Sequence, residues 1–264
     1  MLEIKNIFKT FNAGTINEKR ALNGVSLTLN DGDFVTVIGG NGAGKSTLMN
    51  AIAGVFGVDS GSIVIDGVDL THLPEYKRAK YIGRVFQDPM MGTAATMQIE
   101  ENLALAARRG KKRTLRIGIT KAEREEYREQ LKILGLGLEN RMTAKVGLLS
   151  GGQRQALTLL MATLQKPKLL LLDEHTAALD PKTAAKVLET TQRIVEKDNL
   201  TTLMITHNMR DAITYGNRLI MMYNGRIVVD VSGEEKKKLT VEQLLELFSK
   251  ASGSDEVNDK LLLS

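Results

Sequence analysis

Two kinds of apolar pattern alternate along the chain, and together they predict an α/β fold. Apolar, β-branched or leucine-rich runs of strand length lie at 34–38, 168–172 and 201–205. Leu169 to Leu172 is apolar at every position, which is typical of a strand buried on both faces. Between such strands, helices are predicted at 48–53, 98–109, 121–134, 150–165 and 182–197.

Shorter strand signals in the first third of the chain predict an antiparallel β subdomain. These strands lie at 2–7, 25–29, 62–65 and 81–86, with turn residues at 30–32 and 66–67. The segment 8–18 contains Asn12, Gly14 and Asn17, and it is predicted to be a loop. The first third therefore combines antiparallel strands with one strand of the core.

The C-terminal part of the chain is predicted to end in a hairpin and a short helix. Asn224-Gly225, a favoured two-residue turn, joins strands at 218–223 and 226–231. Short helices are predicted on both sides of this hairpin, at 208–215 and 240–248. The polar segment 249–264 is predicted to be a mobile tail.

The helices between 98 and 146 are predicted to form an inserted helical lobe, because no strand signal of comparable strength interrupts them. The core would then comprise 1–88 and 166–248, and the lobe about 89–165. A basic run lies between two helices of this lobe: Arg108, Arg109, Lys111, Lys112, Arg113 and Arg116. Such a run is either a solvated face or a contact for anionic lipid headgroups.

Composition narrows the class of protein without deciding its function. The chain has 264 residues, of which 42% are hydrophobic, so one large domain with a full core is expected. Cysteine is absent, which excludes disulfides and cysteine-based metal sites. No stretch approaches the ~18 apolar residues of a membrane span, and the N-terminus has no apolar signal core. The net charge of +5 favours neither nucleic acid nor membrane as a partner.

The main chemical signal is a glycine-rich loop after the strand at 34–38. The loop consists of Gly39, Gly40, Asn41, Gly42, Ala43, Gly44, Lys45, Ser46 and Thr47. It matches G-x-x-x-x-G-K-[ST] in the strand–loop–helix context that a P-loop requires. The glycines let backbone N–H groups point at a phosphate, and the helix N-terminus adds partial positive charge. Lys45 would reach the β- and γ-phosphates and Ser46 would ligate Mg²⁺, so a nucleoside triphosphate is the predicted ligand.

Two carboxylates emerge at the end of the buried strand that contains Leu169 to Leu172. Asp173 and Glu174 would repel each other unless a cation lay nearby, and Mg²⁺ on a triphosphate would supply one. Asp173 would hold the metal through water, and Glu174 would act as general base on the attacking water. The alternative is a helix start that carries acidic residues.

A third motif, Leu149–Gln153, allows two interpretations that the residues alone do not separate. Ser150 before two glycines is a normal helix N-cap. The same groups, the Ser150 hydroxyl and the amides of Gly151 and Gly152, could instead hold a second phosphate.

Together, the loop at 39–47, Leu149–Gln153 and Leu169–Glu174 resemble the ATP-binding subunits of ABC transporters, over about 1–248. The resemblance implies a P-loop NTPase core with a mixed sheet, the antiparallel subdomain and the helical lobe. It also implies ATP and Mg²⁺ as ligands and a head-to-tail dimer. Each ATP would lie between one P-loop and the signature residues of the partner copy: Ser150, Gly151, Gly152 and Gln153.

Further residue roles are implied by this resemblance alone. Gln87 matches the glutamine loop that contacts metal and water, and His207 matches the switch histidine at the γ-phosphate. Asp180 matches the loop that crosses the dimer interface, although it is also a good N-cap before a proline. Phe11 occupies the place of an aromatic residue under the adenine, where the family usually has tyrosine. His175 departs from the common proline at its position, and we interpret it as a structural variation.

The functional prediction is an ATPase that energises a transporter, with a bacterial importer of amino acids or related small solutes as the leading hypothesis. Separately encoded permease subunits, a second copy of the chain and an extracellular solute-binding protein would be its partners. It would then lie at the cytoplasmic face of the membrane, without direct contact with nucleic acid. The alternatives are an export ATPase and a soluble ABC ATPase that acts on nucleic acid or ribosomes.

Overall fold

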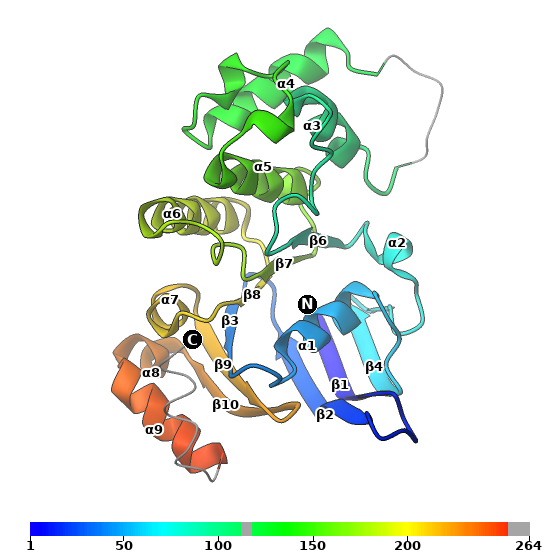
Figure 1. Ribbon diagram of the computed structural model, residues 1–264, viewed down its shortest axis with the longest axis vertical. Coiled ribbons are helices and arrows are strands. Elements are labelled where there is room, and N and C mark those ends of the chain that lie inside the picture. Colours follow the sequence, from blue (N-terminus) through cyan, green and yellow to red (C-terminus); the bar gives the residue numbers. More distant parts are fainter. Residues whose placement is uncertain (112–117, 253–264) are drawn as a thin grey trace.

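The computed structural model describes residues 1–111 and 118–252, and its strands form two sheets (Figure 1). The antiparallel sheet has the strand order β2 (Lys19–Leu29), β1 (Leu2–Phe11), β4 (Ser60–Ile65) and β5 (Val68–Asp69). The mixed sheet has the order β10 (Arg226–Ser232), β9 (Arg218–Tyr223), β3 (Phe34–Ile38), β8 (Thr202–Ile205), β7 (Leu169–Asp173) and β6 (Ile82–Val85). Neighbouring strands of the mixed sheet run parallel, except that β10 is antiparallel to β9.

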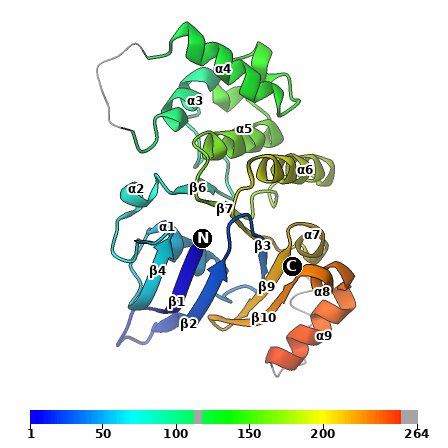
Figure 2. The ribbon, with the colours of Figure 1, turned by 180° about the vertical axis from the view of Figure 1, so that it is seen from behind.

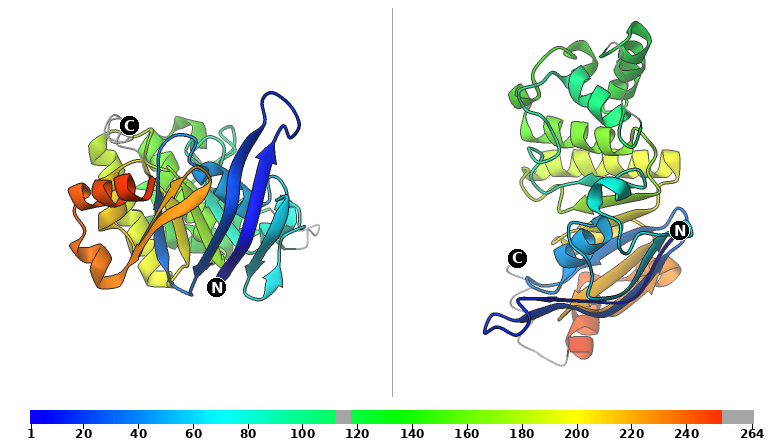
Figure 3. Two further views of the ribbon diagram at one scale, coloured as in Figure 1. Left: turned by 90° about the horizontal axis from the view of Figure 1, so that it is seen from below. Right: turned by 90° about the vertical axis from the view of Figure 1, so that its right-hand side faces the viewer.

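The helices group by the surface that they cover. Those that pack against the sheets are α1 (Lys45–Ala53), α6 (Pro181–Asp198), α7 (Met209–Thr214), α8 (Gly233–Lys238) and α9 (Val241–Ser252). The short α2 (Glu75–Arg78) is joined to the end of α1 by hydrogen bonds from Arg78 to the carbonyls of Ala51 and Ile52. The lobe contains α3 (Ile99–Ala107), α4 (Lys121–Lys132) and α5 (Gly151–Thr163), with short 3₁₀ turns at Leu138–Asn140 and Val146–Leu148. Figure 2 and the right-hand view of Figure 3 show this lobe at the opposite end of the molecule from β1 and β2. Among the described helices, none is both long and apolar enough to pass through a bilayer.

The leucine run of β7 separates two hydrophobic cores. Because side chains alternate along a strand, Leu169 and Leu171 pack with α1 and the antiparallel sheet. Leu170 and Leu172 pack with the lobe helices and α6 on the other face. All four side chains are fully buried. This explains why the run carries no polar position, and it supports the predicted two-sided burial.

A third apolar cluster joins the C-terminal helices to the strand before the glycine-rich loop. Ile38 at the end of β3 packs with Met209 of α7 and with Leu244 and Phe248 of α9. The Phe248 ring also meets the Tyr223 ring edge-on, at a centroid distance of 5.5 Å. The predicted C-terminal helix therefore covers one end of the mixed sheet.

Several predicted boundaries differ from the structure. The segment 8–18 was predicted to be a loop, but β1 continues to Phe11, and β2 already begins at Lys19 rather than at 25. Register shifts along the β1–β2 pair break the alternation that would reveal these strands. The short helices α2 and α8 were not predicted, since one turn of helix carries almost no periodic signal.

The predicted tail also begins later than expected. Residues 249–252 belong to α9, whereas the prediction of mobility for 253–264 lies outside the described residues. Three members of the predicted basic run, at 112, 113 and 116, lie outside them as well. The strand predicted at 81–86 as part of the antiparallel subdomain is instead β6 of the mixed sheet, where it runs parallel to β7. The predicted architecture, a mixed sheet with an antiparallel subdomain and a helical lobe, otherwise agrees with the structure.

Candidate nucleotide-binding site

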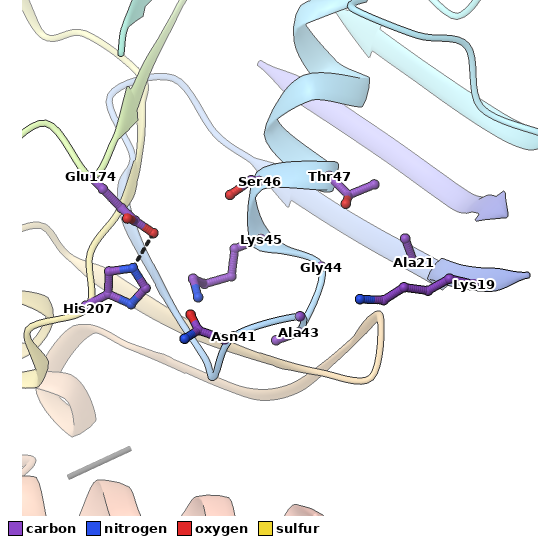
Figure 4. A pocket seen from close by; sticks show the side chains of 11 residues that line it. Lys19, Ala21, Asn41, Ala43, Gly44, Lys45, Ser46, Thr47, Glu174 and His207 are labelled. Atoms are coloured by element: carbon purple, nitrogen blue, oxygen red, sulfur yellow. Dashed lines mark ion pairs between the residues drawn. The ribbon is translucent and has the colours of Figure 1, made fainter. Parts of the chain in front are cut away.

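A pocket opens where the glycine-rich loop meets the ends of β7 and β8 (Figure 4). Its lining includes most of the predicted P-loop together with the two residues predicted to act at the γ-phosphate, Glu174 and His207. The full lining is Lys19, Ala21, Asn41, Gly42, Ala43, Gly44, Lys45, Ser46, Thr47, Glu174 and His207. Segments far apart in the sequence thus converge on one cavity.

The loop is shaped by glycines that tolerate no side chain. Gly39 has φ 148°, and a Cβ there would lie 2.3 Å from the carbonyl oxygen of Met222. Gly44, the N-cap of α1, has φ 105°, and a Cβ there would lie 2.6 Å from the carbonyl oxygen of Ala21. The backbone of the loop therefore passes close to neighbouring strands. No side chain caps this end of α1, so its first amides are available to an anion.

Lys45 lies inside the loop and points into the pocket. Its Nζ donates to the carbonyl oxygens of Gly39 (2.6 Å) and Gly40 (3.3 Å), and the residue is 5% exposed. Burial lowers the pKa of Lys45, while the nearby Glu174 and Asp173 carboxylates oppose that change. The ammonium is thus placed at the centre of the site by backbone carbonyls.

Glu174 and His207 face the loop from the ends of adjacent strands. Residues of β7 and β8 pair in parallel, with Asp173 opposite Ile205, so the residues that follow them meet at one edge. The Glu174 amide donates to the Ile205 carbonyl (3.1 Å). His207 Nε2 lies 2.6 Å from Glu174 Oε1, and because a carboxylate only accepts, the imidazole nitrogen is the donor. This pair stands opposite Lys45 and Ser46.

Asp173, unlike Glu174, lies beside an arginine. Its Oδ2 lies 3.2 Å from Arg84 Nη2, which also donates to the side-chain oxygen of Asn50 (2.6 Å). Burial raises the pKa of Asp173, and Arg84 partly offsets that rise. A further cation beside this carboxylate would lower its pKa again.

The residues present fit a Mg²⁺ ion that takes most of its ligands from nucleotide and water. Among the described residues, no group of three or more acidic or histidine side chains is arranged to hold a metal. Ser46 and Asp173 offer hydroxyl and carboxylate oxygens, the ligand types that Mg²⁺ prefers. Mg²⁺ beside a phosphate-binding loop usually has only one or two protein ligands, and phosphate oxygens and water supply the rest.

The signature residues lie outside this pocket, at the start of α5. Gln153 N donates to Ser150 Oγ (3.3 Å), and Ser150 N donates to the Gln153 side chain (3.2 Å), so the helix caps itself. A Cβ on Gly152 would lie only 2.1 Å from Thr183 Cγ2 in α6. Asp180 caps α6 by accepting from Thr183 N (3.1 Å). One chain therefore brings the signature and Asp180 together on one surface, apart from the lining of the pocket.

Gln87 and Phe11 also lie outside the lining. Gln87 is exposed just after β6, and the carbonyl before it, that of Phe86, accepts from the buried Gln155 of α5 (3.1 Å). Phe11 packs edge-on against Phe56, with ring centroids 5.2 Å apart. Their predicted contacts with water, metal and adenine remain predictions.

His175 makes the contacts of a core residue. It is 2% exposed, and its Nε2 lies 3.1 Å from the Thr191 hydroxyl. Burial lowers its pKa to about 4, so the ring is neutral near pH 7. These contacts agree with the interpretation of His175 as a structural variation.

The sequence reasoning missed three residues near the site. Lys19 and Ala21 line the pocket from β2, and Arg84 approaches Asp173 from β6. The signal for the first two lay in the missed extension of β2. No local pattern marks Arg84, because its role depends on the pairing of β6 with β7.

Comparisons with known proteins agree with this geometry. A family model described as "ABC transporter" matches residues 22–177. The chain is 47% identical to a tyrosine transport ATP-binding protein of Clostridioides difficile, over 95% of this chain and 100% of that protein. It is 34% identical to the spermidine/putrescine import ATP-binding protein PotA of Haemophilus influenzae, over 89% of this chain and 59% of that longer protein.

Solved structures give the same result. A dimeric ATP-binding cassette in a post-hydrolysis state, bound to ADP and Pi, superimposes with a TM-score of 0.75 and 30% identity, over 88% of this chain and 98% of that one. The predicted P-loop NTPase fold and the resemblance drawn from three motifs are confirmed. The chain belongs to the ABC transporter family, as an ATP-binding subunit with ATPase activity.

Proposed function

We propose that the chain hydrolyses Mg²⁺-bound ATP between two copies of itself and thereby drives import of an amino acid or a related small solute. The observation that carries the catalytic part is the convergence of Lys45, Ser46, Glu174 and His207 on one pocket. The similarity to a tyrosine transport ATP-binding protein over that protein's whole length supports the solute class.

The chain's own residues divide the work of phosphoryl transfer to water. The loop amides and Lys45 hold the β- and γ-phosphates and stabilise the charge that develops on them. Glu174 accepts a hydrogen bond, and then a proton, from the attacking water. His207 donates a hydrogen bond to Glu174 and orients that carboxylate. When this hydrogen bond breaks, the same ring nitrogen would be free to contact the γ-phosphate.

Ser46, Asp173 and Gln87 would hold Mg²⁺, with Asp173 acting through water. When bound, the ion neutralises phosphate charge. Asp173 must stay ionised for this role, and Arg84 supports its ionised form. Gln87 lies at the junction of core and lobe, so it would report the state of the site to the lobe.

The partner copy supplies the second phosphate-binding end. Ser150 and Gly151 are exposed, and the two hydrogen bonds of the cap are long, at 3.2 and 3.3 Å. A γ-phosphate presented by another copy would offer better acceptors to these amides. Asp180 lies at the same surface and would cross the dimer interface.

Transport requires partners that span the membrane. We propose separately encoded permease subunits that contact the helical lobe near 87–101, with an extracellular solute-binding protein in the same system. The chain then lies at the cytoplasmic face of the membrane. Closure and reopening of the ATP-bound dimer would move the permeases.

Co-purification followed by reconstitution tests this proposal. The complex captured through this chain would be placed in vesicles with ATP, and uptake of radiolabelled tyrosine, alanine and spermidine would be compared. We expect permease subunits in the complex and ATP-dependent accumulation of tyrosine above the other two solutes. Capture of ribosomes or nucleic acid without permeases, or ATP-driven efflux, would contradict it.

A further inference from the structure

Lys19 is a basic side chain in the pocket that none of the motifs includes. It is the first residue of β2 and pairs with Phe11 across the antiparallel sheet. A Cβ placed on Gly42 would lie 3.4 Å from Lys19 Nζ, so the ammonium stands directly over the loop. In Figure 4 the Lys19 side chain points toward the loop from the side opposite Glu174 and His207.

The backbone around Lys19 is tied to the loop. The Ala43 carbonyl accepts from Gly225 N (3.0 Å), and the Gly225 carbonyl accepts from Asn23 N of β2 (2.8 Å). The carbonyl of Ala21 lies against Gly44. These contacts hold the β2 backbone against the loop at 21–23, two residues after Lys19, whose own side chain is exposed.

The two lysines of the pocket differ in their surroundings. Lys45 Nζ is held by two carbonyls and lies near two carboxylates. Within the described part of the chain, the Lys19 ammonium has no carboxylate within ion-pair distance. An anion that enters the pocket would be its nearest strong acceptor.

The order of side chains along the pocket indicates which phosphate of the nucleotide Lys19 would contact. Glu174 and His207 mark the γ-phosphate end, Lys45 and Ser46 follow, and Lys19 lies beyond Gly44 (Figure 4). We propose that Lys19 Nζ binds an oxygen of the α-phosphate, the phosphate nearest the ribose. This inference rests on the nucleotide site proposed above and adds a binding residue to it.

The proposal has a distinctive kinetic consequence. The α-phosphate is unchanged by hydrolysis, so a contact with it is equally strong for ATP, ADP and the transition state. Such uniform binding lowers KM without raising kcat. Removal of Lys19 should therefore weaken both nucleotides by the same factor and leave kcat unchanged.

Titration calorimetry with ADP and with a slowly hydrolysed ATP analogue tests this contact. Lys19→Met should weaken both nucleotides about tenfold, because a charge-assisted hydrogen bond at an exposed site is lost. Lys19→Arg keeps the charge and should stay within about threefold of the wild type. Arg20→Met is the matched control, because it removes one charge from the next residue of β2, which is exposed and does not line the pocket.

Each outcome decides the inference. Unchanged affinity in Lys19→Met, equal losses in Lys19→Met and Arg20→Met, or a loss confined to the ATP analogue would each overturn it. Lys45→Ala, measured in the same series, separates failure of the Lys19 contact from failure of the whole nucleotide site. If Lys45→Ala loses affinity and Lys19→Met does not, the nucleotide site stands and only the role of Lys19 fails. If Lys45→Ala also binds normally, the proposed site itself is wrong.

Discussion

Helices α1 and α5 both begin with backbone amides that could bind a phosphate, but these amides have no side-chain cap at α1 and are capped at α5. At α1 the glycine loop leaves the first amides without a side-chain cap and surrounds them with Lys45, Glu174 and His207. At α5 the Ser150–Gln153 capping box occupies the end of the helix, and Ser150 is exposed. Both are helix N-termini suited to phosphate, but only one lies in a pocket.

We propose that one copy of the chain contains a complete phosphate cradle at α1 and only part of a second one at α5. Gly152 has no room for a side chain because α6 lies against it. This packing keeps the exposed amides of α5 on a surface shared with Asp180. We therefore expect the amides of α5, which lie outside the pocket, to bind a phosphate only when another copy presents it, whereas the pocket at α1 would bind nucleotide alone.

The largest expected effect is the loss of ATP hydrolysis in Glu174→Gln, which changes the cradle at α1. The amide cannot take a proton from water, so turnover should fall by about 10² to 10⁴-fold. Nucleotide affinity should stay near that of the wild type, because the loop and Lys45 are intact. Phosphate release and nucleotide binding measured on the same sample check this, and rapid steady-state turnover would remove Glu174 from the role of base.

Ser150→Arg tests the phosphate contact proposed at the start of α5. Its long, charged side chain would block the exposed amides, so turnover should fall at least about tenfold while one copy still binds ATP. Thr120→Arg is a matched control, since Thr120 forms the same type of exposed capping box at α4. If Thr120→Arg lowers turnover as much, loss of a helix cap rather than loss of a phosphate contact explains the result.

Lys45→Ala should lower nucleotide affinity by about ten- to a hundredfold, because a buried cation that contacts the phosphates is removed. Equilibrium binding of a fluorescent nucleotide measures this loss. An affinity equal to that of the wild type would contradict the cradle at α1. Lys5→Ala, at an exposed site outside the pocket, controls for the change in net charge.

The smallest effect on catalysis, and a clear one on stability, is expected at His175. Its pKa of about 4 in the folded state lies below the value of about 6.5 for an unfolded chain. The unfolded chain therefore binds more protons between these pH values, and stability is complete above pH 6.5 and declines as pH falls to 4. The contribution lost is about 3 kcal/mol.

Urea unfolding at a series of pH values measures this decline. His175→Gln keeps a hydrogen-bonding side chain but cannot titrate, so it should lack this part of the acid sensitivity. The difference between wild type and variant isolates His175 from the carboxylates. Identical pH dependence in the two proteins would show that His175 does not stay neutral in the folded core.

Local sequence patterns predicted those parts of the molecule whose structure is determined by residues that are neighbours in the chain. The glycines of the loop and the buried run of β7 each carry their own signal. The N-terminal extension of β2 was missed, because its pairing with β1 is irregular and its residues are exposed. Arg84 was missed because only sheet pairing brings it to Asp173. The separation of the signature from the P-loop within one chain likewise depends on the tertiary fold.

The most direct test of the central claim is a disulfide between two different copies. The chain has no cysteine, so Asn41→Cys in one copy and Ser150→Cys in the other, both with Glu174→Gln, give a single possible cross-link between P-loop and signature. We predict a cross-linked dimer that forms with ATP and Mg²⁺ and is absent without nucleotide. No cross-link in the presence of ATP, with both variants folded and binding nucleotide, would contradict a site shared by two copies.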